Sequence, residues 1–221
     1  MPRDLFDLPI WFDLGATFAF SLTGALAAMK RGYDIVGLFF VALATGVGGA
    51  LIRDGIFIQQ GPPPIVTYPL YIYMVAAGAL GGLLLGSRAK HFSRLIAIID
   101  AIGLGAYACF GVQKSLIAGL AVPAAVLVGL INACGGGLLR EILVREEPLV
   151  FKPGQFYVLT ALAGAVCFAV LTLHFNWAGT PAAWVAIGLT FAFRMGTIIF
   201  NWRTSPAVSP LDALDEKAER D

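Results

Sequence analysis

The sequence predicts an all-α integral membrane protein with seven transmembrane helices, in which two inverted repeats of three helices are followed by a seventh helix. Three observations predict this class. The composition is 58% hydrophobic and only 13% charged. Seven long apolar stretches follow one another, and the first three match the next three when the chain is shifted against itself.

The composition excludes several classes of protein. The 221 residues carry 15 basic and 14 acidic side chains, about half the charged share of a typical soluble domain. Too few charges are present to cover a globule of this size, which excludes an ordinary soluble enzyme, a disordered chain and a nucleic-acid binder. Cys109, Cys134 and Cys167 lie in apolar stretches without metal-ligand spacing, so we interpret them as small apolar side chains.

The seven apolar stretches have the length of membrane spans. A helix needs roughly 20 apolar residues to cross a bilayer. The first stretch is not a cleaved signal peptide, because acidic residues precede it and it continues into Lys30 and Arg31. The expected spans are 9–29, 35–54, 70–87, 95–114, 119–139, 155–174 and 181–202.

The basic residues between the spans predict an orientation, because cytoplasmic loops are rich in Lys and Arg. Alternate connections are basic, whereas residues 55–69 and 174–181 contain neither Lys nor Arg. We therefore expect the N-terminus outside the cell, the C-terminus in the cytoplasm, and an inner-membrane location. The basic loop residues on the expected cytoplasmic side are Lys30, Arg31, Arg88, Lys90, Arg94, Arg140, Arg145, Lys152 and Arg203.

The expected organisation is a single transmembrane domain over residues 1–202. It contains a first repeat at about 9–87, a second at about 95–174 and an extra helix at 181–202. Residues 203–221 are predicted to form a disordered cytoplasmic tail, because they are rich in acidic residues and contain two prolines.

The internal repeat is found at an offset of 87 residues. Asp13 then matches Asp100, and the segment Gly48-Gly49 matches Gly135-Gly136. Arg53-Asp54 matches Arg140-Glu141, and no gap is needed from Asp13 to Asp54. The matches fall on glycines and charges, which apolar bias alone does not align. Because each unit has three spans, the second copy would enter the membrane inverted, with a site or pathway between the copies.

Glycine clusters near the ends of the second and fifth spans predict places where these helices bend. The clusters are Gly48-Gly49 and Gly135-Gly136-Gly137. Each glycine costs roughly 1 kcal/mol in helix propensity, and exposed carbonyls at membrane depth are tolerated only against protein or a wet cavity. Close helix packing is the alternative interpretation. Two equivalent clusters in inverted halves favour a pathway.

Thr45 and Asn132 occupy equivalent positions, three residues before the first paired glycine of each cluster. Under inverted symmetry both would approach the same axis from opposite sides. Their uncharged oxygens could replace part of a cation's hydration shell. The alternative is a hydrogen bond between helices, and the sequence leaves both open.

Several charged residues lie inside or beside the spans. Arg53 and Arg140 follow Gly49 and Gly136 by one helical turn, and either anchor the helices at headgroup level or form charges at each mouth. Lys114 either responds to the membrane potential or extends to the headgroups. Asp13 and Asp100 suit the positive ends of helices. Arg194 lies well inside the last span, and the sequence does not identify its partner.

The sequence offers no basis for catalysis. The segment Gly46-Val47-Gly48-Gly49 is not a dinucleotide-binding motif, and the chain contains no P-loop, zinc-protease or nucleophile-elbow motif. We therefore expect a protein that is not an enzyme and that has no cofactor or bound metal.

The segments GVGGALIRD and ACGGGLLREIL, in a chain of seven spans with a repeat of three plus three, resemble the trimeric intracellular cation channel family, in its bacterial branch. The resemblance covers roughly residues 9–202. It implies a homotrimer with a pore in each subunit, potassium as the principal permeant ion, and glycine kinks in helices two and five that shape the pore.

The resemblance transfers to individual residues. The glycine positions carry over to Gly48, Gly49, Gly135, Gly136 and Gly137, although Ala50 stands where the second motif has Gly137. Lys114 is near the basic position on the fourth helix that is linked to gating in animal members. Those members also bind an anionic lipid, but no basic cluster here matches that site residue by residue.

A second hypothesis is a secondary transporter of a small solute such as glycine, a role proposed for some relatives. Such a carrier should offer a helix N-terminus to the carboxylate, and an acid or carbonyls to the amine. The glycine segments offer one polar residue each and no obvious acid, which favours the channel.

Overall fold

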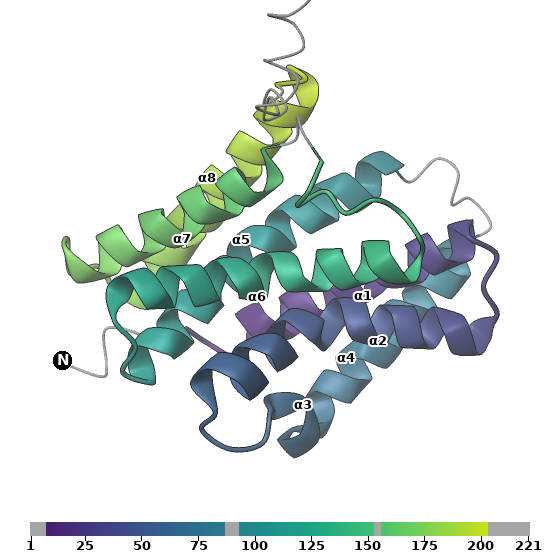
Figure 1. Cartoon of the computed structure of the whole chain (residues 1–221), viewed down its shortest axis with the longest axis horizontal. Helices are drawn as coiled ribbons and strands as arrows, with labels where there is room; N and C mark the ends of the chain where they lie inside the picture. The colour runs from purple at the N-terminus through teal and green to yellow at the C-terminus, as the bar shows by residue number, and fades with distance from the viewer. Residues whose placement is uncertain (1–7, 87–92, 153–155, 203–221) are drawn as a thin grey trace, which may run out of the picture.

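The computed structural model describes residues 8–86, 93–152 and 156–202, which form helices joined by short connections (Figure 1). In chain order the helices are α1 (Trp11–Lys30), α2 (Ile35–Ile52), the π-helix η2 (Arg53–Ile58), α3 (Pro64–Thr67), α4 (Pro69–Leu85), α5 (Ser93–Ile117), α6 (Val122–Leu143), α7 (Tyr157–Leu173) and α8 (Gly179–Ile199).

Each of the seven expected spans coincides with a helix of at least 17 residues. Five of them, α1, α2 with η2, α5, α6 and α8, are long and apolar enough to cross a membrane. Helices α4 and α7 are apolar but have 17 residues each. The sequence did not predict η2, which continues α2 to Ile58, or the single turn α3. The tail 203–221 and the loop residues Arg88 and Lys90 lie outside the described residues.

The first helix of each half ends in the same way. Gly32 follows α1 with a φ of +74°, and Gly119 follows α5 with a φ of +88°. Glycine adopts this left-handed conformation without steric cost, so it allows the chain to reverse after each helix. The side chain of Asp34 then accepts a hydrogen bond from the Gly37 N–H at 2.7 Å, which caps the start of α2. These two glycines are 87 residues apart, at the offset of the repeat.

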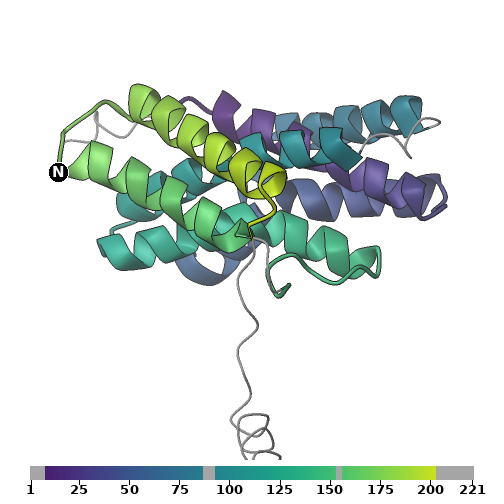
Figure 2. The same ribbon diagram turned by 90° about the horizontal axis from the view of Figure 1, so that it is seen from above.

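Helices α2 and α6 lie side by side and run in opposite directions through the middle of the bundle (Figure 1). Helix α4 packs against α1, whereas α7 and α8 pack against α5. The view from above shows the helices running roughly along one direction (Figure 2). Helices α1, α2, α5 and α6 therefore form a central four-helix bundle, with α4 packed on α1 and with α7 and α8 packed on α5.

The glycine clusters lie where α2 and α6 cross. A Cβ atom added to Gly49 would collide with the backbone carbonyl oxygen of Asn132, and one added to Gly136 would collide with that of Thr45. The contacts are reciprocal, because Gly49 and Gly136, and Thr45 and Asn132, are each 87 residues apart. Glycine is thus required on both helices for their backbones to touch.

Neither helix is interrupted at these glycines. Helix α2 is continuous from Ile35 to Ile52 and α6 from Val122 to Leu143, with the glycines inside both. The departure from α-helical geometry comes after the glycines, at η2. Neither helix is interrupted at its glycines because the neighbouring backbone packs directly on them; a kink within a continuous helix stays a prediction.

We predict that Gly136→Ala destabilises the protein by about 1 to 3 kcal/mol, because the added methyl group separates α2 from α6. The melting temperature of the detergent-purified protein measures this. Gly188→Ala is the matched control, since Gly188 lies on α8 with open space around its Cβ position. Equal melting temperatures for the two variants would contradict the close crossing.

Candidate functional site: two buried charge clusters beside a helix crossing

Thr45 and Asn132 lie on opposite helices of the crossing, each with its carbonyl against a glycine of the other helix, and both are fully buried. The Thr45 hydroxyl donates to the Val41 carbonyl of its own helix at 2.6 Å. The Asn132 amide donates to the Tyr107 carbonyl of α5 at 2.7 Å, and its oxygen accepts from the Arg53 guanidinium at 3.4 Å. The Thr45 side chain lies against Gly24 of α1, whereas the Asn132 side chain lies against Gly111 of α5 and bonds to other helices. A shared approach of the two side chains to one axis stays a prediction.

Two buried hydroxyl groups, on Tyr107 of α5 and Thr17 of α1, lie in contact beside the crossing. The Tyr107 hydroxyl lies 2.9 Å from that of Thr17 and donates to the Gly46 carbonyl. The Thr17 hydroxyl in turn donates to the Asp13 carbonyl at 2.8 Å. Neither Tyr107 nor Thr17 stands out in the sequence, because a single hydroxyl inside an apolar helix carries no pattern of its own. Polar groups therefore connect the crossing with the first charge cluster.

The first charge cluster, here called the Arg53 cluster, consists of Asp13, Arg53, Asp54, Tyr71 and Lys114. Arg53 has no exposed surface, and its Nε and one terminal nitrogen donate to the two Asp54 oxygens, each at 2.8 Å. Its guanidinium also lies 3.9 Å from the Asp13 carboxylate, to which the Tyr71 hydroxyl donates a hydrogen bond. Lys114 completes the cluster with an ion pair to Asp54 at 2.8 Å. The charges are thus mutually neutralised inside the bundle.

The second cluster, the Arg140 cluster, consists of Thr23, Asp100, Arg140 and Glu141. The buried Arg140 guanidinium binds Asp100 at 3.0 Å, Glu141 at 3.2 Å and the Thr23 hydroxyl at 3.1 Å. Glu141 also accepts a hydrogen bond from the Leu149 N–H at 2.7 Å. Arg53 and Arg140 therefore share one plan, in which each arginine binds an acid on the first helix of its repeat and the acid next to it in the chain.

These ion pairs correct two sequence-based interpretations. Anchoring of Arg53 and Arg140 at headgroup level is wrong, because both side chains are buried. Asp13 and Asp100 do more than suit the positive ends of helices, since they are partners of the arginines. The physical reason is that a guanidinium removed from water must be paired, and one partner of each arginine lies 40 residues away in the sequence.

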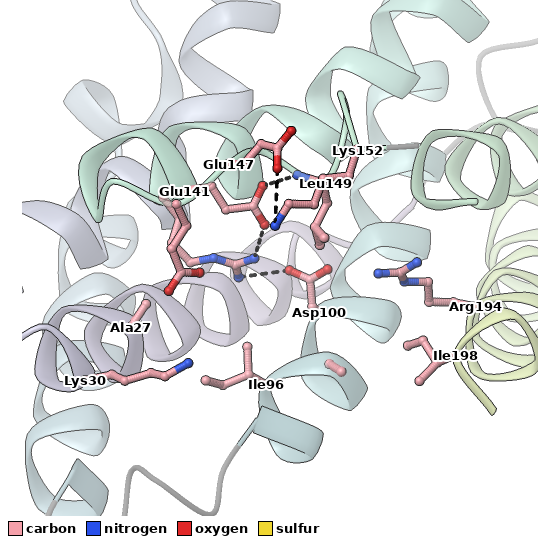
Figure 3. Close-up of a pocket in the computed structure, with 13 residues that line it drawn as sticks. Ala27, Lys30, Ile96, Asp100, Glu141, Glu147, Leu149, Lys152, Arg194 and Ile198 are labelled. Carbon is pink, nitrogen blue, oxygen red and sulfur yellow. Dashed lines mark hydrogen bonds and ion pairs between the residues drawn. The ribbon is translucent and has the colours of Figure 1, made fainter. Parts of the chain in front are cut away.

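A cavity of about 290 Å³ opens beside the Arg140 cluster. Figure 3 shows Asp100 and Glu141 on one side of it, Ala27 and Lys30 on another, and Arg194 reaching in from α8. Next to the Arg53 cluster the space is smaller, about 110 Å³, and Lys114 lines it. Ala27 stands 87 residues before Lys114, so the two residues are equivalent in the repeats. The small Ala27 lines the larger cavity, whereas the long side chain of Lys114 lines the smaller one.

Arg194 and Lys114 can now be placed. The Arg194 guanidinium lies over the Tyr157 ring, 4.9 Å from its centroid, so it contacts the second repeat from the extra helix. Lys114 is 31% exposed and bound to Asp54, so it is neither free in the headgroup region nor fully enclosed. Within the described ranges, no three His, Cys, Asp or Glu side chains gather closely enough to hold a metal ion.

We predict that Asp100→Asn lowers the stability of the purified protein by about 3 kcal/mol, because it leaves the buried Arg140 undercompensated. The control is Glu146→Gln, which breaks the half-exposed pair with Arg31 and should cost no more than about 1 kcal/mol. Thermal unfolding in detergent measures both. Equal small shifts would mean that Arg140 is solvated and the cluster is open to water.

The chain matches a family model described as "Glycine transporter" over two segments, residues 10–86 and 97–172. The segments begin 87 residues apart and together cover more than half of the chain. A membrane protein of Deinococcus radiodurans assigned to UPF0126 is 31% identical over 75% of this chain and 77% of its own length. The inner membrane protein YadS of Escherichia coli is 27% identical over 95% of this chain and 98% of its own.

The chain is also similar to solved structures of membrane proteins. The orthologue of the trimeric intracellular cation channel from Rhodobacter sphaeroides superposes with a TM-score of 0.77 at 29% identity, over 86% of this chain and 97% of that one. A second structure, described as a basis for conductance through TRIC cation channels, gives a TM-score of 0.79 at 27% identity over 92% and 98%. The chain is therefore a multi-pass helical membrane protein that belongs to the bacterial branch of the trimeric intracellular cation channel (TRIC) family.

Proposed function

We propose that this protein is a channel for monovalent cations, with potassium as the principal ion and one pore in each subunit. The observation that carries the proposal is the set of buried polar groups around the crossing of α2 and α6, which lies between two buried clusters of paired charges. Membrane proteins keep such groups in the apolar interior chiefly where ions or water pass. The proposal assigns the protein no catalytic reaction and no cofactor.

The pore lies between two inverted repeats in this proposal. The reciprocal contacts at the crossing support it. They are the contacts expected when a two-fold axis perpendicular to two antiparallel helices relates one helix to the other, as in inverted repeats. The same reciprocity extends to Gly48, which packs on Leu139, and Gly135, which packs on Ile52. The family model's match to two segments with the same offset adds support from the sequence.

The proposed route enters through the cavity beside the Arg140 cluster, passes Thr45 and Asn132, and leaves beside the Arg53 cluster. Neutral oxygens along the way can replace water around a cation without holding it too tightly. Because the backbones are in contact at the crossing, the proposed route is closed at this point. Because Gly48, Gly49, Gly135, Gly136 and Gly137 have no side chains, the two helices can bend or part there to open the route.

Lys114 suits the role of a gating charge at one mouth. It is bound to Asp54, which also binds Arg53, so its movement would disturb the whole Arg53 cluster. Moving one charge across the membrane field changes the energy by about 2.3 kcal/mol per 100 mV, which is comparable to the strength of an ion pair at a partly exposed site. The resemblance to animal members points in the same direction.

We propose a homotrimer in the cell inner membrane, surrounded by lipids. A related solved structure is that of a trimeric intracellular cation channel orthologue, and a related bacterial protein is described as an inner membrane protein. Many large apolar side chains, among them Phe40, Leu84, Trp184 and Ile199, are exposed on the isolated chain. They are available to lipid or to neighbouring subunits, and the native mass in detergent measures the number of subunits.

A carrier for a small zwitterion is the alternative, in keeping with the description of the family model. A zwitterion would need a free acid and a free base in one site. Asp100, Glu141 and Arg140 already bind each other, so a solute would have to break these pairs to enter. This pairing favours the channel, and solute uptake by liposomes tests the carrier directly.

The basic loops predict which mouth faces the cytoplasm. A membrane-impermeant thiol reagent applied to intact cells should label Pro62→Cys and should not label Arg145→Cys, because Arg145 lies with the other basic loop residues beyond α6. Both positions are in exposed connections. Permeabilised cells provide the control, since both cysteines must then react. Labelling of position 145 alone in intact cells would reverse the orientation.

The pore assignment is tested with potassium flux and bilayer recording. The double variant Thr45→Ala/Asn132→Ala should change the conductance or the preference for potassium over sodium, because it removes the polar side chains at the crossing. Thr172→Ala is the matched control, since the buried Thr172 hydroxyl also bonds to its own helix, but on α7. Native mass is compared first. Unchanged conduction in an assembled double variant would remove both residues from the pore.

A further inference from the structure

One face of α1 connects the two charge clusters. Residues spaced by three and four positions lie on the same face of a helix. On α1, one such face runs from Asp13, in the Arg53 cluster, to Ala27, which lies beside the cavity of the Arg140 cluster. Thr17 and Thr23 lie between them and hydrogen-bond to Tyr107 and Arg140 respectively. Phe20 is the apolar residue between these two threonines.

The repeat identifies what is unusual about Phe20. At the offset of 87, Thr17 corresponds to Leu104 and Phe20 corresponds to Tyr107. The hydrogen-bonded pair Thr17–Tyr107 on one side of the crossing therefore has the apolar pair Leu104–Phe20 as its equivalent on the other side. Leu104 and Phe20 are both fully buried in the same apolar cluster. One half of the crossing is thus lined by hydroxyls and the other half by hydrocarbon.

The Phe20 ring fills the space between the central helices. It stacks on the Tyr107 ring with a centroid distance of 5.1 Å and an angle of 19° between the planes. A Cβ added to Gly103 of α5 would lie 2.6 Å from one edge of the ring, and a Cβ added to Gly136 of α6 would lie 3.5 Å from another. The ring thus contacts α5 directly, lies against the glycine cluster of α6, and leaves no room for a side chain at Gly103.

We propose that Phe20, together with Leu104, forms the apolar barrier that closes the ion path between the cavity and the hydroxyl groups of Thr17 and Tyr107. This proposal rests on the channel function proposed above. An apolar constriction excludes water, and a cation does not cross it without its hydration shell. The barrier lies on the Arg140 side of the Phe20–Tyr107 stack. Opening requires the ring to leave this position, for example when α2 and α6 part at Gly136.

The test makes the two halves alike. The double variant Phe20→Tyr/Leu104→Thr places on the apolar side the same hydroxyl pair that the other side already has. We expect potassium flux into liposomes to rise about tenfold, which corresponds to a barrier lower by about 1.4 kcal/mol. The reciprocal variant Thr17→Leu/Tyr107→Phe extends the apolar section and should lower the flux by a similar factor.

Phe168→Tyr is the matched control, because Phe168 is an equally buried aromatic residue in the same apolar cluster but lies on α7. It should leave the flux unchanged. Native mass and melting temperature establish that each variant assembles. If the first double variant does not assemble, the single changes Phe20→Tyr and Leu104→Thr are measured, and each should raise the flux by a smaller factor.

The outcomes separate the barrier from the channel function. A wild-type protein that conducts, with an assembled double variant whose flux is unchanged, overturns the barrier and leaves the channel intact. A rise that Phe168→Tyr produces equally also overturns it, because the effect would then come from general loosening of the core. An assembled wild-type protein that passes no potassium overturns the proposed function, and the barrier with it.

Discussion

The direct contact between the backbones of α2 and α6 is the constraint on which the rest of this structure depends. It requires glycine at Gly49 and Gly136, because each lies against a carbonyl of the opposite helix. Without hydrophobic attraction between helices in lipid, such close contact is a main source of association. The same absence of side chains that makes the crossing tight also makes it adaptable. A larger residue would hold the helices apart permanently, whereas glycine permits contact and separation.

The buried charges follow from this crossing. Arg53 and Arg140 come four residues after Gly49 and Gly136, so they emerge one turn beyond the contact, where the first helix of each repeat supplies an acid. Buried pairs of this kind contribute little net stability, because removing two charges from water costs nearly what their attraction returns. Their value is in specifying how α1, α2, α5 and α6 fit together. In a conduction path they also supply polar surface without a large net charge.

The two repeats share their plan and differ at two pairs of equivalent positions. Ala27 leaves a cavity where Lys114 fills the equivalent space, and Phe20 is apolar where Tyr107 has a hydroxyl. In each pair of equivalent residues, the polar or charged residue lies toward the Arg53 cluster and the apolar residue lies toward the Arg140 cluster. Under the proposed function, one mouth is therefore an open cavity and the other is guarded by an ion pair. A symmetric pair of repeats would have no such polarity.

The sequence by itself determined the class of the protein, the seven apolar helices and the offset of the repeat. These features depend on local hydropathy and on spacing along the chain, which are visible without a fold. It also brought Thr45, Asn132 and the glycines into equivalent positions. It could not assign partners to Arg53, Arg140 or Arg194, and it overlooked Tyr71, Tyr107 and Phe20. Tertiary structure decided these, because a buried charge or hydroxyl takes its role from side chains on other helices, up to 117 residues away in the chain.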